Sequence, residues 1–555
     1  DGQGRWKDST GQDLNGGNLR FLGIANAQSV ETIGDIGVSK AGNLHVGRVA
    51  GAGSATFNVG ALNRIANGTL TVTHTAATLG QPIANPVTSF ERLTTTSVLI
   101  TGGLTTNGSG VVNGGMVAPW IIDATENSFM GYNVAGVGHG FQPLKSTGAV
   151  AAGQSEYTFR ATSAGNFGSG RLATDIVDIV TGAQALDANT TIYALRTAQN
   201  INPTAAFNSL TLNSGGLIMT GGTISTVQTA SATVSPVTLL MTLNFGAAGA
   251  SEALIYTSAA GVINAQIAAT GLTKFGASSL QLSASNSSLT GTINVNQGSL
   301  ILLNPVSNSG TAIASVTNSR DILLNGATLV IDSLLSNNAG RDSNIASGSR
   351  ITGNIGSNVT VTADSTITNN NQGVMQRINN LTIADLGANS PIYLNFSQQG
   401  ITVTGITTLG ANSNIIGSTF GSANQTIFEG QVVGGASGKL IKVGNGGLMF
   451  ANGTNSFGTD GSIGLEVWAS TQNTATSLVA STSLTGTPFG VGDINILPGG
   501  MIRLADASNI ANQKVFAASD DFAFAGVSIG YNNNGTPLTQ ANLLSLLSGG
   551  AAADG

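Results

Sequence analysis

The chain has 555 residues and a formal net charge of −6, and 8% of its residues are charged while 77 are glycine; an average soluble domain carries about three times the charge and about half the glycine. The 20 Lys and Arg are scattered, so no basic stripe is available for phosphates and we expect no nucleic-acid partner. The lack of cysteine excludes disulfides, cysteine-rich zinc sites and thiol nucleophiles, and no apolar run reaches the roughly 18 residues of a membrane-spanning helix.

The hydrophobic pattern predicts a folded, all-β chain. Hydrophobic residues make up 41% of the sequence, and Leu, Ile and Val stand in short alternating runs that can bury a core. Since successive residues of a strand point to opposite faces, one face of each run should point inward. Helix signals are nearly absent between the runs.

Residues 1–80 read as an N-terminal β-rich segment with weak strand patterns, such as "GTLTVT" from Gly68. The sequence begins at Asp1 rather than Met and shows no signal sequence, so we expect a processed part of a longer chain. The absence of cysteine fits export at least as well as a cytosolic location.

Residues 81–200 are expected to be less regular, with long loops standing off the regular core, so that the N-terminal third as a whole is loop-rich. Aromatic residues concentrate in this stretch. Because aromatic rings can stack on sugars, these residues are the best candidates for a recognition surface; the alternative is that they pack the loops onto the core. The candidates are Trp120, Phe129, Tyr132, Tyr157 and Phe159.

Residues 201–535 carry a recurring short unit of a strand, a glycine turn and a second strand. It occurs as "LTLNSGGLIM" from Leu210, "INVNQGSLIL" from Ile293, "ILLNGATLVI" from Ile322 and "INILPGGMIRL" from Ile494. Recurring short strands without intervening helices favour coils that stack on neighbouring coils, as in a parallel β-helix. Glycines such as Gly298, Gly326 and Gly499 mark the turns, where a positive φ is needed.

A longer repeat surrounds this unit. "GLTKFGASSLQL" from Gly271 and "KLIKVGNGGLMF" from Lys439 share their spacing. The matching positions are Leu272, Lys274, Gly276, Leu280 and Leu282 in the first copy and Leu440, Lys442, Gly444, Leu448 and Phe450 in the second. We expect both lysines at outward positions beside an inward leucine, where a solvated lysine discourages association of strand edges.

Residues 536–555 are expected to form a C-terminal cap or tail. Leu543, Leu544 and Leu547 share one helical face, with Thr539 as an N-cap and Gly549 as a stop, so a short capping helix is predicted there.

The full repeat over residues 271–302 resembles the autotransporter-associated β-strand repeat. That pattern reads Gly-Leu-x-Lys-x-Gly, then Leu-x-Leu, Asn and Gly, a strand, Gly and Leu-x-Leu; residues 439–450 match its first half and 492–510 its second. The resemblance implies a right-handed parallel β-helix in a secreted or surface protein of a Gram-negative bacterium. The family's C-terminal membrane barrel has no counterpart here, so self-translocation is not carried over.

No constellation of residues predicts catalysis. Asp175 with Asp178 and the adjacent Asp520 and Asp521 are the nearest to carboxylate pairs, but general acid–base work needs two carboxyls that converge. Ser528 lies in a Gly-x-Ser-x-Gly sequence that no histidine follows, against the order that this motif requires. We therefore expect no enzymatic activity.

The histidines predict no metal or cofactor site either. His45, His74 and His139 are too far apart in the sequence to form a metal motif. Neither metal nor cofactor is expected.

The sequence thus favours a non-enzymatic, extracellular structural β-solenoid whose copies associate into a cell-surface or matrix fibre or layer. Terminal coils present unpaired strand edges, and few charges are available to block them. The main alternative is a monomeric adhesin stalk whose aromatic loops bind glycan or another cell surface. A polysaccharide lyase or hydrolase built on a β-helix is a third, less favoured interpretation.

Overall fold

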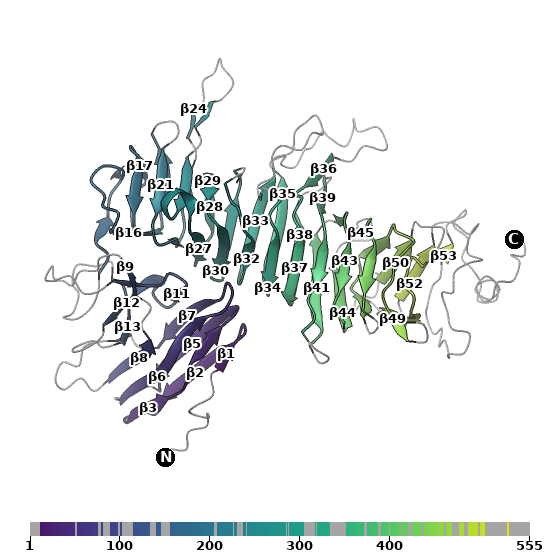
Figure 1. Ribbon diagram of the computed structural model, residues 1–555, viewed down its shortest axis with the longest axis horizontal. Helices are drawn as coiled ribbons and strands as arrows, with labels where there is room; N and C mark the ends of the chain where they lie inside the picture. Colours follow the sequence, from purple (N-terminus) through teal and green to yellow (C-terminus); the bar gives the residue numbers. More distant parts are fainter. Residues whose placement is uncertain are drawn as a thin grey trace, which may run out of the picture. The chain divides into compact units, whose positions relative to one another are not determined.

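The structure is a computed structural model and falls into two compact units, residues 1–300 and 301–555 (Figure 1). The residues that it describes are 12–49, 53–75, 79–80, 89–97, 100–102, 115–133, 140–145, 156–204, 208–225, 227–229, 237–239, 241–284, 286, 288–304, 317, 319–333, 351–370, 374–386, 390–398, 400–411, 413–419, 425–435, 438–459, 462–468, 477–481, 487–497, 500–504 and 530–531.

Both units are built from β-strands that pair mostly in parallel, which confirms the all-β prediction at this level. Among the described residues the one helical element is a 3-10 turn, η1 (Ala247–Gly249). We call a coil a set of successive strands that contributes one strand to each neighbouring sheet.

The first unit begins with the following strands: β1 (Gln12–Leu14), β2 (Asn18–Gly23), β3 (Gln28–Thr32), β4 (Ile36–Val38), β5 (Ala41–Arg48), β6 (Gly53–Arg64), β7 (Thr69–His74), β8 (Ser89–Ser97), β9 (Ile100–Gly102), β10 (Met116–Val117), β11 (Ile121–Asp123), β12 (Ser128–Asn133) and β13 (Gly140–Pro143). It continues with β14 (Phe159–Ala161), β15 (Gly165–Asn166), β16 (Ile176–Ile179), β17 (Gln184–Leu186), β18 (Thr190–Ile192), β19 (Ala194–Thr197), β20 (Ile201–Pro203), β21 (Ser209–Leu212), β22 (Gly216–Met219), β23 (Thr223–Ile224), β24 (Val227–Thr229), β25 (Val237–Leu239), β26 (Thr242–Phe245), β27 (Glu252–Thr257), β28 (Gly261–Ile263), β29 (Gln266–Ala268), β30 (Gly271–Phe275), β31 (Ser279–Leu282) and β32 (Ile293–Val295).

The boundary between the units falls inside β33 (Ser299–Asn304). The second unit contains β34 (Ile322–Asn325), β35 (Thr328–Ser333), β36 (Ile351–Asn354), β37 (Val359–Ala363), β38 (Ser365–Asn369), β39 (Val374–Ile378), β40 (Leu381–Ile383), β41 (Ile392–Gln398), β42 (Ile401–Val403), β43 (Thr407–Leu409), β44 (Ser413–Thr419), β45 (Gln425–Phe428), β46 (Val432–Gly434), β47 (Lys439–Val443), β48 (Gly447–Phe450), β49 (Ile463–Val467), β50 (Ser477–Ser481), β51 (Asp493–Ile496), β52 (Gly500–Leu504) and β53 (Gly530–Tyr531).

The first three coils are more regular than the prediction of a loop-rich N-terminal third. β1 pairs with β4 and β4 with the end of β6; β2, β5 and β7 pair in order; and β3 and β8 flank the first part of β6, all in parallel. Burial alternates from Ala41 to Val46 of β5, where Leu44 and Val46 are buried and Asn43 and His45 are partly exposed. This regular strand pattern could not be recognised in the sequence, because Thr, Asn and His occupy the outward positions and no repeat is visible.

Antiparallel pairing is concentrated in residues 100–143, where β12 pairs with β10, β11 and β13. The parallel ladder resumes at β14, well before the expected start at residue 201. Arg160, Asp178 and Arg196 stand beside one another in its first three strands, and Arg196 is paired with Asp178 at 3.3 Å. These strands are only three or four residues long, too short for alternation to be recognised in the sequence.

An ion pair of Arg64 joins an early coil of the first unit to a late one. Arg64, at the end of β6, donates to both carboxylate oxygens of Glu252 on β27, at 2.6 and 3.0 Å, and its Nε donates to the carbonyl of Gly68 at 2.8 Å. A bidentate Arg–carboxylate pair fixes the relative orientation of its two side chains as well as their distance. This pair therefore holds the end of β6 next to β27.

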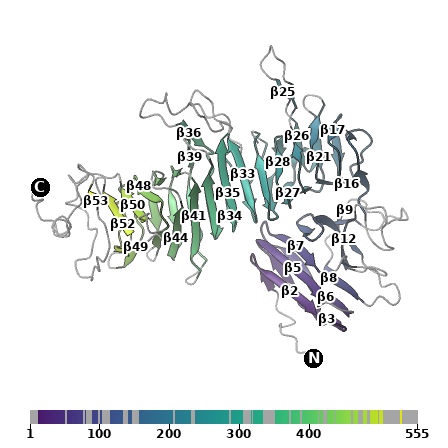
Figure 2. The same cartoon turned by 180° about the vertical axis from the view of Figure 1, so that it is seen from behind.

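The second unit has three parallel sheets. Within it the strand orders are β34-β37-β40-β43-β46, β35-β38-β41-β44-β47-β49-β51 and β36-β39-β42-β45-β48-β50-β52-β53. Figure 2 shows β36, β39, β48, β50 and β52 of the third sheet from behind. Aromatic rings stack inside this unit, with Phe450 within 5.6 to 6.1 Å of Phe428, Phe457 and Phe489, centroid to centroid.

The repeat leucines Leu272, Leu280, Leu282, Leu440 and Leu448 are all fully buried. Turn glycines Gly276, Gly298 and Gly444 have φ of +84°, +71° and +81°, the left-handed region that glycine enters without steric cost. A Cβ on Gly298 would also lie 2.5 Å from the Nζ of Lys274, so this corner needs a glycine for space as well.

The prediction that Lys274 and Lys442 face solvent is wrong. Both are fully buried, because each lysine follows an inward leucine by two residues and so lies on the same face of its strand. Lys274 stands in register between Ile255 and Val295, both buried.

Hydrogen bonds to backbone carbonyls at the turns between strands, the corners of the coil, offset the desolvation cost of burying these amines. Lys274 Nζ donates to the carbonyls of Gly276, Ser278 and Gln297 at 2.5, 2.5 and 2.7 Å, and Lys442 Nζ donates to those of Val443 and Gly444 at 2.8 and 2.9 Å. Burial lowers the pKa of each lysine to about 7. Each amine therefore supplies hydrogen bonds to the carbonyls of a tight corner.

We expect Lys442→Met to lower the free energy of unfolding by about 2–4 kcal/mol, because it leaves buried carbonyls without a donor. Lys439→Met on the same strand is the matched control; Lys439 is partly exposed and its ion pair with Glu466 should contribute about 1 kcal/mol or less. Urea unfolding followed by circular dichroism measures both. Equal losses in the two variants would contradict the proposed role of the buried amine.

Candidate functional site

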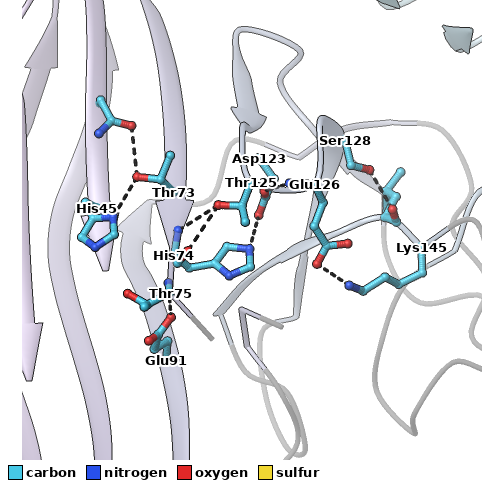
Figure 3. Close-up of polar contacts among 12 residues, drawn as sticks. His45, Thr73, His74, Thr75, Glu91, Asp123, Thr125, Glu126, Ser128 and Lys145 are labelled. Carbon is cyan, nitrogen blue, oxygen red and sulfur yellow. Dashed lines mark hydrogen bonds and ion pairs between the residues drawn. The ribbon is translucent and has the colours of Figure 1, made fainter. Parts of the chain in front are cut away.

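A polar cluster lies inside the first unit, where β5, β7, β8 and β11 approach one another (Figure 3). It contains His45, His74, Glu91 and Asp123. Parallel pairing places His45 beside Thr73 and Ile122 beside Thr71, so the topology brings together residues that are far apart in the sequence.

His74 and Asp123 form the centre of this cluster. The imidazole Nε2 of His74 lies 3.2 Å from Oδ2 of Asp123, and the side chains are 1% and 0% exposed. The other carboxylate oxygen of Asp123 accepts from the backbone N–H of Glu126 at 2.8 Å. Thr125 Oγ1 accepts from the backbone N–H of His74 at 3.0 Å. The turn after β11 is therefore fastened to the end of β7.

Glu91 and His45 complete the cluster on the other side of β7. Glu91 is fully buried, and its Oε2 accepts from the backbone N–H of Thr75 at 2.8 Å while Oε1 lies 4.0 Å from Nε of Arg48. His45 Nδ1 lies 3.0 Å from Oγ1 of Thr73. Burial, followed by the charge of Arg20, lowers the pKa of His45 although Glu91 acts in the opposite direction.

The cluster extends through two further contacts toward β13. Lys145 pairs with Glu126, and the hydroxyl of Ser128 donates to the carbonyl of Leu144 at 2.7 Å and lies 2.9 Å from the hydroxyl of Tyr157. Burial raises the pKa of Tyr157 well above its ordinary value. This phenol is therefore a neutral hydrogen-bonding group at any physiological pH.

The geometry of this cluster supports a structural role. An Asp–His pair can orient an imidazole for base catalysis only if a substrate or nucleophile reaches the imidazole, and His74 is sealed from solvent. Within the described ranges no group of three or more His, Asp or Glu side chains is arranged to hold a metal ion. The cluster joins the third coil to the antiparallel strands that follow it.

The aromatic residues expected on a recognition surface lie inside the first unit. Trp120, Phe129, Tyr132 and Tyr157 are buried, so the recognition-surface prediction is wrong for these four, and the packing alternative describes them. Phe159 is half-buried and is covered by the guanidinium of Arg171, 3.4 Å from its ring centroid. The reason is that β12 and β13 are paired strands whose side chains are buried on both faces.

The carboxylates considered for acid–base chemistry do not converge. Asp178 is buried and paired with Arg196, whereas Asp175 accepts from the backbone N–H of Leu172 at 2.9 Å and closes a turn. The other residues considered in the sequence lie outside the described residues; they are His139, Gly499, Asp520, Asp521, Ser528 and the helix expected over 539–549.

An open surface occurs at the first coil. Among the described residues, β1, β2 and β3 each pair on one side only, with β4, β5 and β6 respectively. Large apolar side chains are exposed on or beside this coil, with Ile24 at 67% and Val30 at 64%; Leu22 and Val49 are exposed as well. Unpaired backbone groups beside exposed apolar side chains are the features that strand edges use to associate.

Comparison with protein-family models, with curated proteins and with solved structures finds no match. No helix among the described residues is long and apolar enough to cross a membrane.

Sequence reasoning missed both the His74–Asp123 pair and the burial of the repeat lysines. The paired residues are 49 positions apart and belong to no motif; only the parallel pairing of β7 with β11 brings them together. For the lysines a usable signal was present, since the i, i+2 spacing to Leu272 and Leu440 already indicates the inward face.

We expect His74→Ala and Asp123→Ala each to destabilise the protein by about 3–5 kcal/mol, because each leaves the other side chain buried without its partner. The double variant should lose much less than the sum, and thermal unfolding of the three variants measures the coupling. His45→Ala, at a half-buried position, is the control and should cost about 1 kcal/mol. Additive losses would mean that the pair contributes no interaction of its own.

Proposed function

We propose that the chain is a non-enzymatic structural subunit, a right-handed β-solenoid whose copies associate into a fibre or layer at the surface of a Gram-negative bacterium or in its matrix. The observation that carries the proposal is the first coil, where among the described residues β1, β2 and β3 each pair on one side only, beside exposed apolar side chains. The handedness and the location rest on the resemblance of residues 271–302 to the autotransporter-associated repeat.

Among the described residues each strand of the first coil carries a single charge, Asp13 on β1, Arg20 on β2 and Glu31 on β3, which is little protection for a strand edge. Natural sheets block their edges with lysine, proline, bulges or covering segments. β3 reads Gln-Ser-Val-Glu-Thr, and Glu31 is its single charge. An edge of this kind can accept a strand from a second copy, with backbone hydrogen bonds supplying affinity and the alternating side chains supplying register.

Self-association agrees with the composition. With 8% charged residues the surface has few like charges to keep copies apart. The chemistry of the interior supports a scaffold too, since the buried ionisable groups described above serve strand corners and coil contacts rather than an accessible cleft.

The two alternatives have weaker support. The adhesin interpretation relied on aromatic rings of which four are buried. The polysaccharide-degrading interpretation relied on carboxylates that do not converge. A second copy of this chain is therefore the favoured partner.

Electron microscopy of the purified protein over a range of concentrations tests the proposal as a whole. Filaments or layers that grow with concentration are expected. Single particles at every concentration would contradict the proposal of self-association.

We expect Val30→Lys to weaken self-association by about tenfold or more, because a lysine on an edge strand brings a charge that must be desolvated in the interface. Leu172→Lys is the matched control, as Leu172 is 62% exposed but lies outside the strands. Sedimentation velocity over a concentration series measures both. Equal dissociation constants for the two variants would place the interface elsewhere.

A further inference from the structure

An exposed tryptophan stands on the outer face of one sheet in the second unit. Trp468 directly follows β49, is 41% exposed, and its backbone N–H donates to the carbonyl of Lys442 at 2.9 Å. Tryptophan is the most costly residue to leave in water, because its large apolar surface is normally buried. An exposed indole that is held in one position is therefore available for contact with a ligand.

Glu466 holds this indole in place. Trp468 Nε1 donates to Oε2 of Glu466 at 2.9 Å, and Lys439 Nζ donates to Oε1 at 2.6 Å. Burial alone raises the pKa of Glu466, but hydrogen bonds from Lys439, Trp468 and Asn495 lower it, and the net direction is downward. The Glu466 carboxylate is thus ionised and accepts a hydrogen bond on each oxygen. Its negative charge is balanced by Lys439, and its second oxygen holds the indole in position.

Parallel register places a second ring on the same face. Tyr393 on β41 stands in one row with Ile415, Ile441, Glu466 and Asn495 of the next four strands. Their inward neighbours are buried, so this row lines the outer face.

A glycine lets the tyrosine lean toward the tryptophan. A Cβ on Gly417 would lie 2.3 Å from the hydroxyl of Tyr393, so the absence of a side chain there gives the phenol its place. In the register, Val443 follows Gly417 and Trp468 follows Val443. Three strand steps separate β41 from β49, about 14 Å at the usual strand spacing.

We propose that this face, from Tyr393 to Trp468, binds a neutral oligosaccharide. A pyranose ring has an apolar face of C–H groups that an indole can cover and a rim of hydroxyls that need polar partners. The amide of Asn495 and the Lys439–Glu466 pair supply those partners near the indole, and the hydroxyl of Tyr393 supplies one further along the same face. A neutral sugar is favoured over an anionic one, because Lys439 is paired with Glu466 and the Asp364 carboxylate beside Tyr393 adds a negative charge.

This surface is independent of the free edge of the first coil, since all its residues belong to the second unit. A chain with both features would join copies of itself through one unit and hold a polysaccharide with the other. Loss of glycan binding and loss of self-association can therefore be observed separately.

The test is a fluorescence titration of the full chain with neutral hexasaccharides of glucose and of N-acetylglucosamine, in both linkage configurations, and with an oligogalacturonate as the anionic probe. At least one neutral hexasaccharide should change the tryptophan emission at millimolar concentration or below. Calorimetry then compares variants: Trp468→Ala should weaken binding by about 30-fold, and Trp468→Phe, which keeps a ring without the N–H, should weaken it less.

Ile406→Ala is the matched control, because Ile406 is an exposed apolar residue of the same unit that directly precedes β43, a strand of another sheet; it should bind like the unaltered chain. An unchanged unfolding midpoint in Trp468→Ala excludes loss of fold as the cause. The proposal is overturned if no neutral hexasaccharide binds, if Trp468→Ala binds as tightly as the unaltered chain, or if the oligogalacturonate binds more tightly than every neutral sugar.

Discussion

Parallel register is the constraint on which the rest of this structure depends. Each coil must return its inward side chains to the positions directly over those of the coil before. In the first unit one such row runs through Leu195, Leu217, Ile255, Lys274 and Val295, all fully buried. A shift of one residue in any strand would turn its whole apolar set to solvent, so the corners between strands have to keep their length and shape.

The corners explain why polar groups occur inside an otherwise apolar stack. A tight turn leaves carbonyls that no neighbouring strand satisfies, and an unsatisfied buried carbonyl is costly. The amine of Lys274 donates to three corner carbonyls, of which that of Ser278 also accepts from the backbone N–H of Ser299. The His74–Asp123 pair serves the same need where the parallel coils meet antiparallel strands: the parallel ladder ends there, and the turn after β11 needs another means of attachment.

The sequence predicts what is periodic and fails where a residue's role depends on the pairing of distant strands. Alternation identifies the all-β class and the inward leucines of the repeat, such as Leu280 and Leu282. It does not identify the ladder at β14, whose strands are too short. The aromatic residues were misplaced because composition cannot tell a ring on a loop from one between paired strands: Tyr132 packs edge-on against Phe141 at 4.9 Å. Lys274 was misassigned because its charge was weighed above its position in the alternation. Trp468 carries no sequence signal, since its platform depends on the register of five strands.

The same constraint links fold to the proposed function. A ladder of parallel strands has no internal reason to stop, so its end must be covered by other chain or by another molecule. Among the described residues β1, β2 and β3 pair on one side only, with Ile24 and Val30 exposed beside them, and we propose that a second copy provides the cover. Association of copies through strand edges requires no catalytic or ligand-binding site, and in this account the charged residues of the interior serve stability.

Hydrogen–deuterium exchange of the backbone amides at low and high protein concentration tests the central claim most directly. The account predicts that amides of β1, β2 and β3 become protected as concentration rises while those of the interior coils stay unchanged. Exchange of the first coil that is the same at all concentrations, or new protection confined to other strands, would contradict it.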